Sequence, residues 1–234
     1  MHQNGTGYRA KTRFAKFYNL PELMSMFKEV ADIQTAETLK LPVPKANFKT
    51  IAVKPSEIQR EMVADLGKRA DAIRKKEVDS KTDNMLKITN EGRKLALDQR
   101  LLNDMLGDFE GSKVNICANN VYEIWERTAE KKSTQLVFCD LSTPNNEGKF
   151  NVYDDLKEKL INKGIPENEI SFIHEANTET RKKELFAKVR KGDVRVLIGS
   201  TAKMGAGTNV QNKIIALHHL DCPWRPADLT QRNR

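Results

Sequence analysis

The sequence lacks the features of a secreted or membrane protein. No stretch approaches the roughly 20 consecutive apolar residues that a membrane-spanning helix needs. Residues 1–16 are polar and basic and lack the apolar core of a signal peptide. Only three cysteines occur (Cys117, Cys139 and Cys222); they lie far apart, and two of them sit among apolar residues. We therefore expect buried free thiols in a cytoplasmic protein, with neither a disulfide framework nor a membrane partner.

Complete catalytic motifs are also missing. Residues 5–12 come within one residue of the phosphate loop G-x-x-x-x-G-K-T, but Ala10 replaces the second glycine. Too few residues precede Gly5 to form the buried strand that such a loop must follow. No acidic pair of the Mg²⁺-binding Walker B kind occurs, and His174-Glu175 lacks the second histidine of a zinc-hydrolase motif. We expect no metal site.

What the sequence does contain is a soluble, basic composition. Its 234 residues suffice for one α/β domain with extra helices, or for two small domains. Hydrophobic residues make up 38% and charged residues 31%, and the net charge is +8. The positive excess is spread along the chain and does not form a basic tail, which fits a surface that faces phosphates but also fits many ordinary cytosolic proteins.

The first half of the chain reads as helical. Residues 55–78 have apolar side chains every three or four positions, and Ser56 and Gln59 have the spacing of a capping box. A second helical stretch is expected from Leu95 through Met105, ending near Gly107, and a third over residues 114–128. Residues 1–50 show little periodicity and are interpreted as a chain draped over another body.

From residue 135 the pattern changes to short apolar runs that alternate with helices. The runs cover residues 136–139, 170–173, 194–198 and 214–217. Helices are expected between them, over residues 152–161 and 178–190. This alternation predicts the α/β class, with a parallel sheet built from right-handed βαβ units.

Residues that follow the apolar runs should carry the chemistry, because open parallel sheets bind ligands beyond the carboxyl ends of their strands. Hydroxyls, a lysine and a glycine-rich loop over residues 205–209 occupy these positions. Glycines let backbone N–H groups approach an anion, and short polar side chains can bind phosphate or ribose. A tight loop between a strand and a helix would explain the same residues without a ligand, so this pattern alone leaves both interpretations open.

Several of these segments, in order, resemble motifs IV, IVa, V and VI in the C-terminal RecA-like lobe (P-loop NTPase type) of superfamily 2 helicases. The Pro-Trp-x-Pro-Ala-Asp stretch resembles the Swi/Snf-like branch, and most closely the large helicase–DNA methylase proteins of phages, plasmids and other mobile elements. The resembling segments are residues 136–140, 172–186, 194–209 and 220–232.

The resemblance implies two domains. Residues 112–234 would be the second RecA-like lobe, and residues 1–111 would be the end of the first lobe and a helical bridge or protrusion. Residues 84–89 resemble the segment that joins the two lobes.

The resemblance also implies a role for individual residues. Backbone contacts to DNA, which position the protein without reading bases, would be made by Ser142, Thr143, Ser200, Thr201 and Lys203. The nucleotide-facing residues would be Gly205, Gly207, Asn209, Gln231 and Arg232.

The sequence departs from the family at its end. Counting from Gln231, Arg234 occupies the glycine position of Q-x-x-G-R-x-x-R, and the finger arginines that stabilise charge on the transferred phosphoryl group would lie beyond it. We therefore expect no catalytic residue here and an inactive isolated fragment of an ATP-dependent DNA helicase or translocase. ATP and Mg²⁺ would be cofactors of the full-length parent, and none is expected on this chain alone. The expected partners are DNA, the first lobe and a DNA methylase domain.

The sequence also allows other interpretations. A non-catalytic DNA-binding or scaffolding module that retains the helicase fold is the main alternative. A Rossmann-type enzyme is disfavoured because residues 140–144 lack the glycine fingerprint. His218 and His219 are expected on opposite faces of a strand, in structural roles. Trp224, between Pro223 and Pro226, is expected to pack into the domain.

Overall fold

The computed structural model describes residues 2–4, 7–9, 18–34, 45–144, 148–204 and 210–233, with side chains from residue 18 onwards. The strands are β1 (His2–Asn4), β2 (Gly7–Arg9), β3 (Thr134–Phe138), β4 (Ile170–Phe172), β5 (Val196–Gly199) and β6 (Ile214–His219). The α-helices are α1 (Leu20–Val30), α3 (Glu57–Arg74), α4 (Met85–Leu97), α5 (Lys113–Arg127), α6 (Val152–Asn162), α7 (Glu179–Lys191), α8 (Thr201–Met204) and α9 (Pro226–Arg232). Short 3₁₀ turns are η1 (Gln99–Leu101), η2 (Glu167–Glu169), η3 (Ile173–Glu175) and η4 (Gln211–Lys213).

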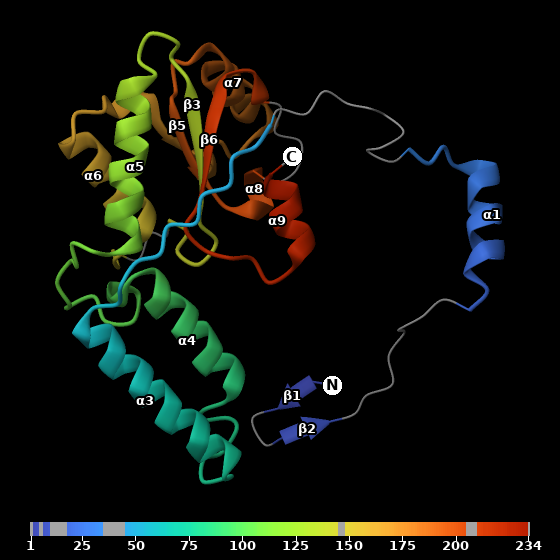
Figure 1. Cartoon of the computed structure of the whole chain (residues 1–234), viewed down its shortest axis with the longest axis vertical. Helices are drawn as coiled ribbons and strands as arrows, with labels where there is room; N and C mark the ends of the chain where they lie inside the picture. Colours follow the sequence, from blue (N-terminus) through green and yellow to red (C-terminus); the bar gives the residue numbers. More distant parts are fainter. Residues whose placement is uncertain are drawn as a thin grey trace.

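A four-stranded parallel sheet forms the centre of the molecule, with helices against it, and the predicted α/β class is confirmed (Figure 1). The strand order is β4-β5-β3-β6, so β3 is hydrogen-bonded on both sides, to β5 and to β6. All four apolar runs of the second half form strands within a few residues of their expected positions. This architecture is consistent with a RecA-like lobe.

Alternation along β3 divides the core into two layers, as the two-residue period of a strand requires. Val137 and the following Cys139 face α5 and α6. Leu136 and Phe138 face α7 and α8. Cys117 and Cys139 are both buried free thiols, as expected, whereas Cys222 is exposed. Burial raises the pKa of the Cys117 thiol to about 12, so this thiol is inert at neutral pH.

Helices α3 and α4 form a hairpin with a small core of its own, which extends below the sheet (Figure 1). The predicted capping box is present: Ser56 accepts a hydrogen bond from the Gln59 backbone, and the Gln59 side chain accepts one from the Ser56 backbone. The Gln59 side chain also donates to the Leu95 carbonyl at 2.8 Å, which ties the two helices together.

The second helix was placed wrongly by the sequence pattern. Helix α4 begins at Met85 rather than near Leu95, because Asn84 caps it by accepting a hydrogen bond from the Lys87 backbone at 3.0 Å. It ends at Leu97 because Asp98 is extended and caps the 3₁₀ turn that follows. Residues 84–89, which resemble an interlobe segment, therefore form the cap and first turns of α4. The proposed boundary at residues 111/112 lies just before Ser112, the cap of α5.

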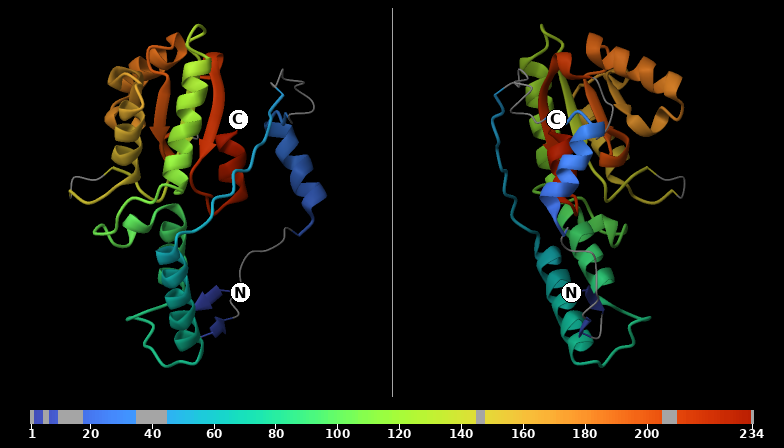
Figure 2. Two further views of the ribbon diagram at one scale, coloured as in Figure 1. Left: turned by 60° about the vertical axis from the view of Figure 1, so that its left-hand side comes forward. Right: turned by 90° about the vertical axis from the view of Figure 1, so that its right-hand side faces the viewer.

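Helix α1 was not predicted. It has no buried residue, and it lies apart from the sheet in Figure 1 and in the left-hand view of Figure 2. Its apolar side chains are exposed to different degrees, from Met24 at 38% to Val30 at 85%. In the described part of the chain, no helix combines the length and the apolar character that a membrane crossing requires.

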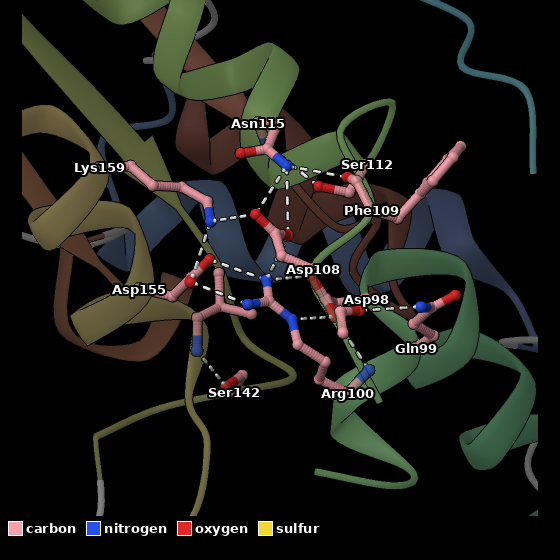
Figure 3. Close-up of polar contacts among 12 residues, drawn as sticks. Asp98, Gln99, Arg100, Asp108, Phe109, Ser112, Asn115, Ser142, Asp155 and Lys159 are labelled. Atoms are coloured by element: carbon pink, nitrogen blue, oxygen red, sulfur yellow. Dashed lines mark hydrogen bonds and ion pairs between the residues drawn. The ribbon is translucent and has the colours of Figure 1, made fainter. Parts of the chain in front are cut away.

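A charge network joins the hairpin to the α/β unit (Figure 3). Arg100, at the end of the hairpin, contacts Asp98 at 2.8 Å, Asp108 at 3.0 Å and Asp155 of α6 at 3.0 Å. Lys159, one turn further along α6, contacts Asp155 at 3.0 Å and Asp108 at 2.7 Å. The Arg100 side chain is only 10% exposed, so its charge depends on these carboxylates. The network holds the hairpin and α6 in one arrangement.

Gly199 sets the packing at the end of β5. A Cβ atom there would lie 2.5 Å from Ile173 Cγ2 and 2.6 Å from Met204 Sδ. We predict that Gly199→Ala lowers the free energy of unfolding by about 1–3 kcal/mol, because both neighbours would have to move. Gly67→Ala is the control: its Cβ would meet nothing within 4 Å in the middle of α3, so stability should rise by about 0.5–1 kcal/mol. Urea denaturation measures both changes, and a neutral Gly199→Ala would contradict this packing.

Candidate functional site

The carboxyl ends of β3, β5 and β6 meet at one edge of the sheet (Figure 1). A polar residue follows each of these strands. Asp140 comes two residues after β3, Thr201 two residues after β5, and Asp221 two residues after β6. Asp140 accepts hydrogen bonds from the Thr201 backbone and hydroxyl, both at 2.7 Å. The Asp221 carboxylate accepts from the backbone of Asp140 at 2.5 Å and of Leu141 at 2.8 Å. These bonds lock the three strand ends together.

Arg232 of α9 occupies the centre of this edge, and its side chain has no exposed surface. Its Nη2 lies 2.8 Å from Asp140 Oδ2 and 3.0 Å from Asp221 Oδ1, and its Nη1 donates to the Asp221 carbonyl at 2.9 Å. Its Nε donates to Thr201 Oγ1 at 2.7 Å. Its guanidinium also lies over the Phe138 ring, 5.2 Å from the centroid. A buried guanidinium is tolerated only with such complete pairing.

The charge of Asp140 is stabilised by its partners. Burial by itself would raise the pKa of this carboxyl, but the hydrogen bonds from Thr201 and the charge of Arg232 outweigh burial, and its pKa lies below the ordinary value of 3.8. Asp140 is therefore an ionised acceptor at neutral pH and not a general acid.

The two histidines of β6 point to different partners, as expected for adjacent strand residues. His218 Nε2 lies 2.9 Å from Gln135 Oε1, and burial lowers its pKa to about 4. His219 stacks on Phe138 with ring centroids 5.5 Å apart. Its pKa is also lowered, first by burial and then by the charge of Arg232. Both are neutral at pH 7 and make structural contacts.

The residues expected to contact DNA differ in their availability. Thr143 is exposed and Lys203 is half-buried. Ser142 is buried, and its hydroxyl accepts a hydrogen bond from the Val152 backbone at 2.9 Å, at the start of α6. Ser200 is buried as well, and the Thr201 hydroxyl is used by Asp140 and Arg232. Thr143 and Lys203 are thus the members of this set that remain available to a ligand.

The residues expected to face a nucleotide are only partly described. Gly205, Gly207 and Asn209 lie outside the described residues, as does Arg234. Gln231 is exposed on α9. Arg232 has a different position from the one expected, because its guanidinium is an internal anchor for α9 and does not face outwards.

The prediction that Trp224 packs into the domain is wrong. Its side chain does not insert into the domain: it is 63% exposed, and the Arg93 guanidinium of α4 lies 4.4 Å from its ring centroid. Arg93 also donates to the Cys222 carbonyl at 2.5 Å. The ring therefore contacts the hairpin through Arg93 instead of entering the core of the sheet domain.

Sequence reasoning missed the importance of Asp140 and Asp221. The available signal was their common position, an acidic residue shortly after an apolar strand, but nothing in the sequence pairs them with Arg232. Among the described residues there is no group of three or more His, Cys, Asp or Glu side chains that could hold a metal ion.

Comparison with known proteins adds no family assignment. No protein-family model matches the sequence, and no curated protein matches it significantly.

Arg232 is predicted to be essential for the integrity of this edge. Arg232→Met would leave the Asp140 and Asp221 carboxylates without their cation, and we expect the free energy of unfolding to fall by about 3–5 kcal/mol. The matched control is Arg225→Met, at a side chain that is 79% exposed and pairs with Asp228 on the surface, where little change is expected. Equal losses for the two variants in urea denaturation would show that the buried network is not stabilising.

His218 predicts a pH dependence of stability. Its pKa falls from 6.5 to about 4 on folding, so the unfolded chain binds the proton more tightly and stability is lost as the pH falls from 6.5 towards 4. His219 shifts in the same direction. We expect His218→Gln to reduce the loss of unfolding free energy between pH 6.5 and pH 4 by up to about 3 kcal/mol. Unfolding free energies measured at a series of pH values test this. Parallel curves for the two proteins between pH 4 and 6.5 would contradict the assignment.

Proposed function

We propose that this chain supplies the second lobe of an ATP-dependent DNA translocase, contacts the DNA backbone through the carboxyl edge of its sheet, and closes over ATP that a first lobe holds. The observation that supports the proposal best is the Arg232 anchor. Helix α9 carries the Gln-Arg pair that resembles the start of motif VI. Arg232 fixes this helix to the ends of the strands, where the residues that resemble motifs IV and V lie.

The side chains at this edge suit contact with DNA, while the chemistry of hydrolysis would belong to the first lobe. Arg232 pairs with both Asp140 and Asp221, so neither carboxylate is free to act as a catalytic acid or base. Thr143, Lys203 and Gln231 remain available on the surface around them. Hydroxyl, ammonium and amide groups bind phosphate oxygens without reading bases. Such an edge can grip a sugar-phosphate backbone, while hydrolysis requires the phosphate-cradling loop of a partner lobe.

DNA binding by the purified chain tests the proposal. We expect it to bind duplexes of unrelated sequence equally, with affinity falling steeply as the salt concentration rises, because backbone contacts release counterions. Lys203→Gln should reduce the slope of log affinity against log salt by about one, since one phosphate contact is lost. Lys183→Gln is the control, an exposed lysine on α7, and should leave the slope unchanged. Fluorescence anisotropy measures these quantities, and a chain with no affinity for duplex DNA at low salt would refute the proposal.

A further inference from the structure

His174 lies at the same edge of the sheet, beyond β4, and takes no part in the Arg232 network. It belongs to η3, which follows β4 directly, and η3 packs against α8. The contact exists because Gly199 has no side chain, so that Ile173 of η3 and Met204 of α8 meet over the end of β5. The chain neighbours of these two residues are His174 and Lys203. The packing therefore places His174 and Lys203 on neighbouring elements, and the positive charge of Lys203 acts on the imidazole.

The imidazole of His174 is held in a defined orientation. The Tyr153 ring meets it edge-on, with centroids 5.3 Å apart. Tyr153 is itself fixed, because its hydroxyl donates to the Cys139 carbonyl at 2.7 Å. His174 Nδ1 is buried and has no hydrogen-bond partner among the described residues. A proton on Nδ1 would be a buried donor without an acceptor, the costlier arrangement, so we assign the proton to Nε2.

The charges around His174 favour an anion. Burial lowers the pKa of His174, and the positive charge of Lys203 lowers it further, so the ring is a neutral hydrogen-bond donor at pH 7. Within the described ranges, Lys203 makes no ion pair with any carboxylate. The acidic residue nearest to His174 in the sequence is Glu175, which is exposed. A fixed neutral donor beside an uncompensated ammonium is suited to a phosphate oxygen.

We propose that His174 and Lys203 together hold one phosphate group of the DNA backbone, with His174 Nε2–H as the neutral donor and Lys203 as the charge. This inference rests on the proposed function only for the identity of the ligand, a phosphate of the DNA backbone. The site would position DNA across the β4 side of the sheet edge, further from α9 than Thr143.

The decisive variant is His174→Phe, which preserves an aromatic ring against Tyr153 and removes an unsatisfied buried nitrogen, so the fold should be retained. We expect affinity for duplex DNA to fall about fivefold, the effect of one hydrogen bond. The salt slope should not change, because a neutral donor displaces no counterion, in contrast to Lys203→Gln. The fold-loss of DNA affinity in the double variant should be smaller than the product of the fold-losses in the two single variants, because both residues hold the same phosphate.

A second readout separates this inference from the proposed function. Inorganic phosphate should shift the imidazole nitrogen signals of His174 in the NMR spectrum of the native chain, and this shift should be lost in Lys203→Gln. If phosphate shifts these signals but duplex DNA does not bind, the phosphate site stands and the DNA function fails. If DNA binds but neither His174→Phe nor phosphate has an effect, the function stands and this inference is overturned. A shift with ATP but not with duplex DNA would overturn the assignment to the DNA backbone.

Discussion

The burial of one positive charge constrains the whole carboxyl edge. Arg232 has no exposed surface, and its hydrogen-bonding groups are satisfied by residues that follow three different strands. Because an unpaired guanidinium inside a protein is very unfavourable, the ends of β3, β5 and β6 have to converge on it. The position of α9, and with it the surface position of Gln231, follows from this convergence.

A second arginine, Arg100, also links two parts of the molecule through carboxylates. Arg100 joins the α3–α4 hairpin to α6 through three carboxylates, just as Arg232 joins α9 to the sheet through two. A planar guanidinium offers several donors in fixed directions, which a lysine cannot do. Each appended element is thus oriented by directional hydrogen bonds, in addition to the non-directional packing of apolar side chains. This explains how elements with little buried surface keep one defined position.

The sequence was informative where structure depends on near neighbours in the chain. The apolar runs and the helices between them indicated the parallel sheet, and Ser56 with Gln59 indicated the start of α3, because these signals are local. The partners of Arg232 could not be predicted, since Asp140 lies 92 positions away in the chain. Trp224 was misjudged for the same reason: its contact, Arg93, belongs to a helix 131 positions before it. The limits of α4 depended on two caps, Asn84 and Asp98, whose role only the backbone conformation reveals.

The strand order has a consequence for how the chain folds. Strand β3 is the first strand of this sheet in the sequence, and its two neighbours, β5 and β6, come about sixty and eighty residues later. Closing such long loops must precede the gain from pairing, and this slows folding. The α3–α4 hairpin closes over only the ten residues between Arg74 and Met85 and can form first. During synthesis, β3 therefore has no neighbouring strand until β5 has left the ribosome, and in that interval its apolar residues are exposed to aggregation.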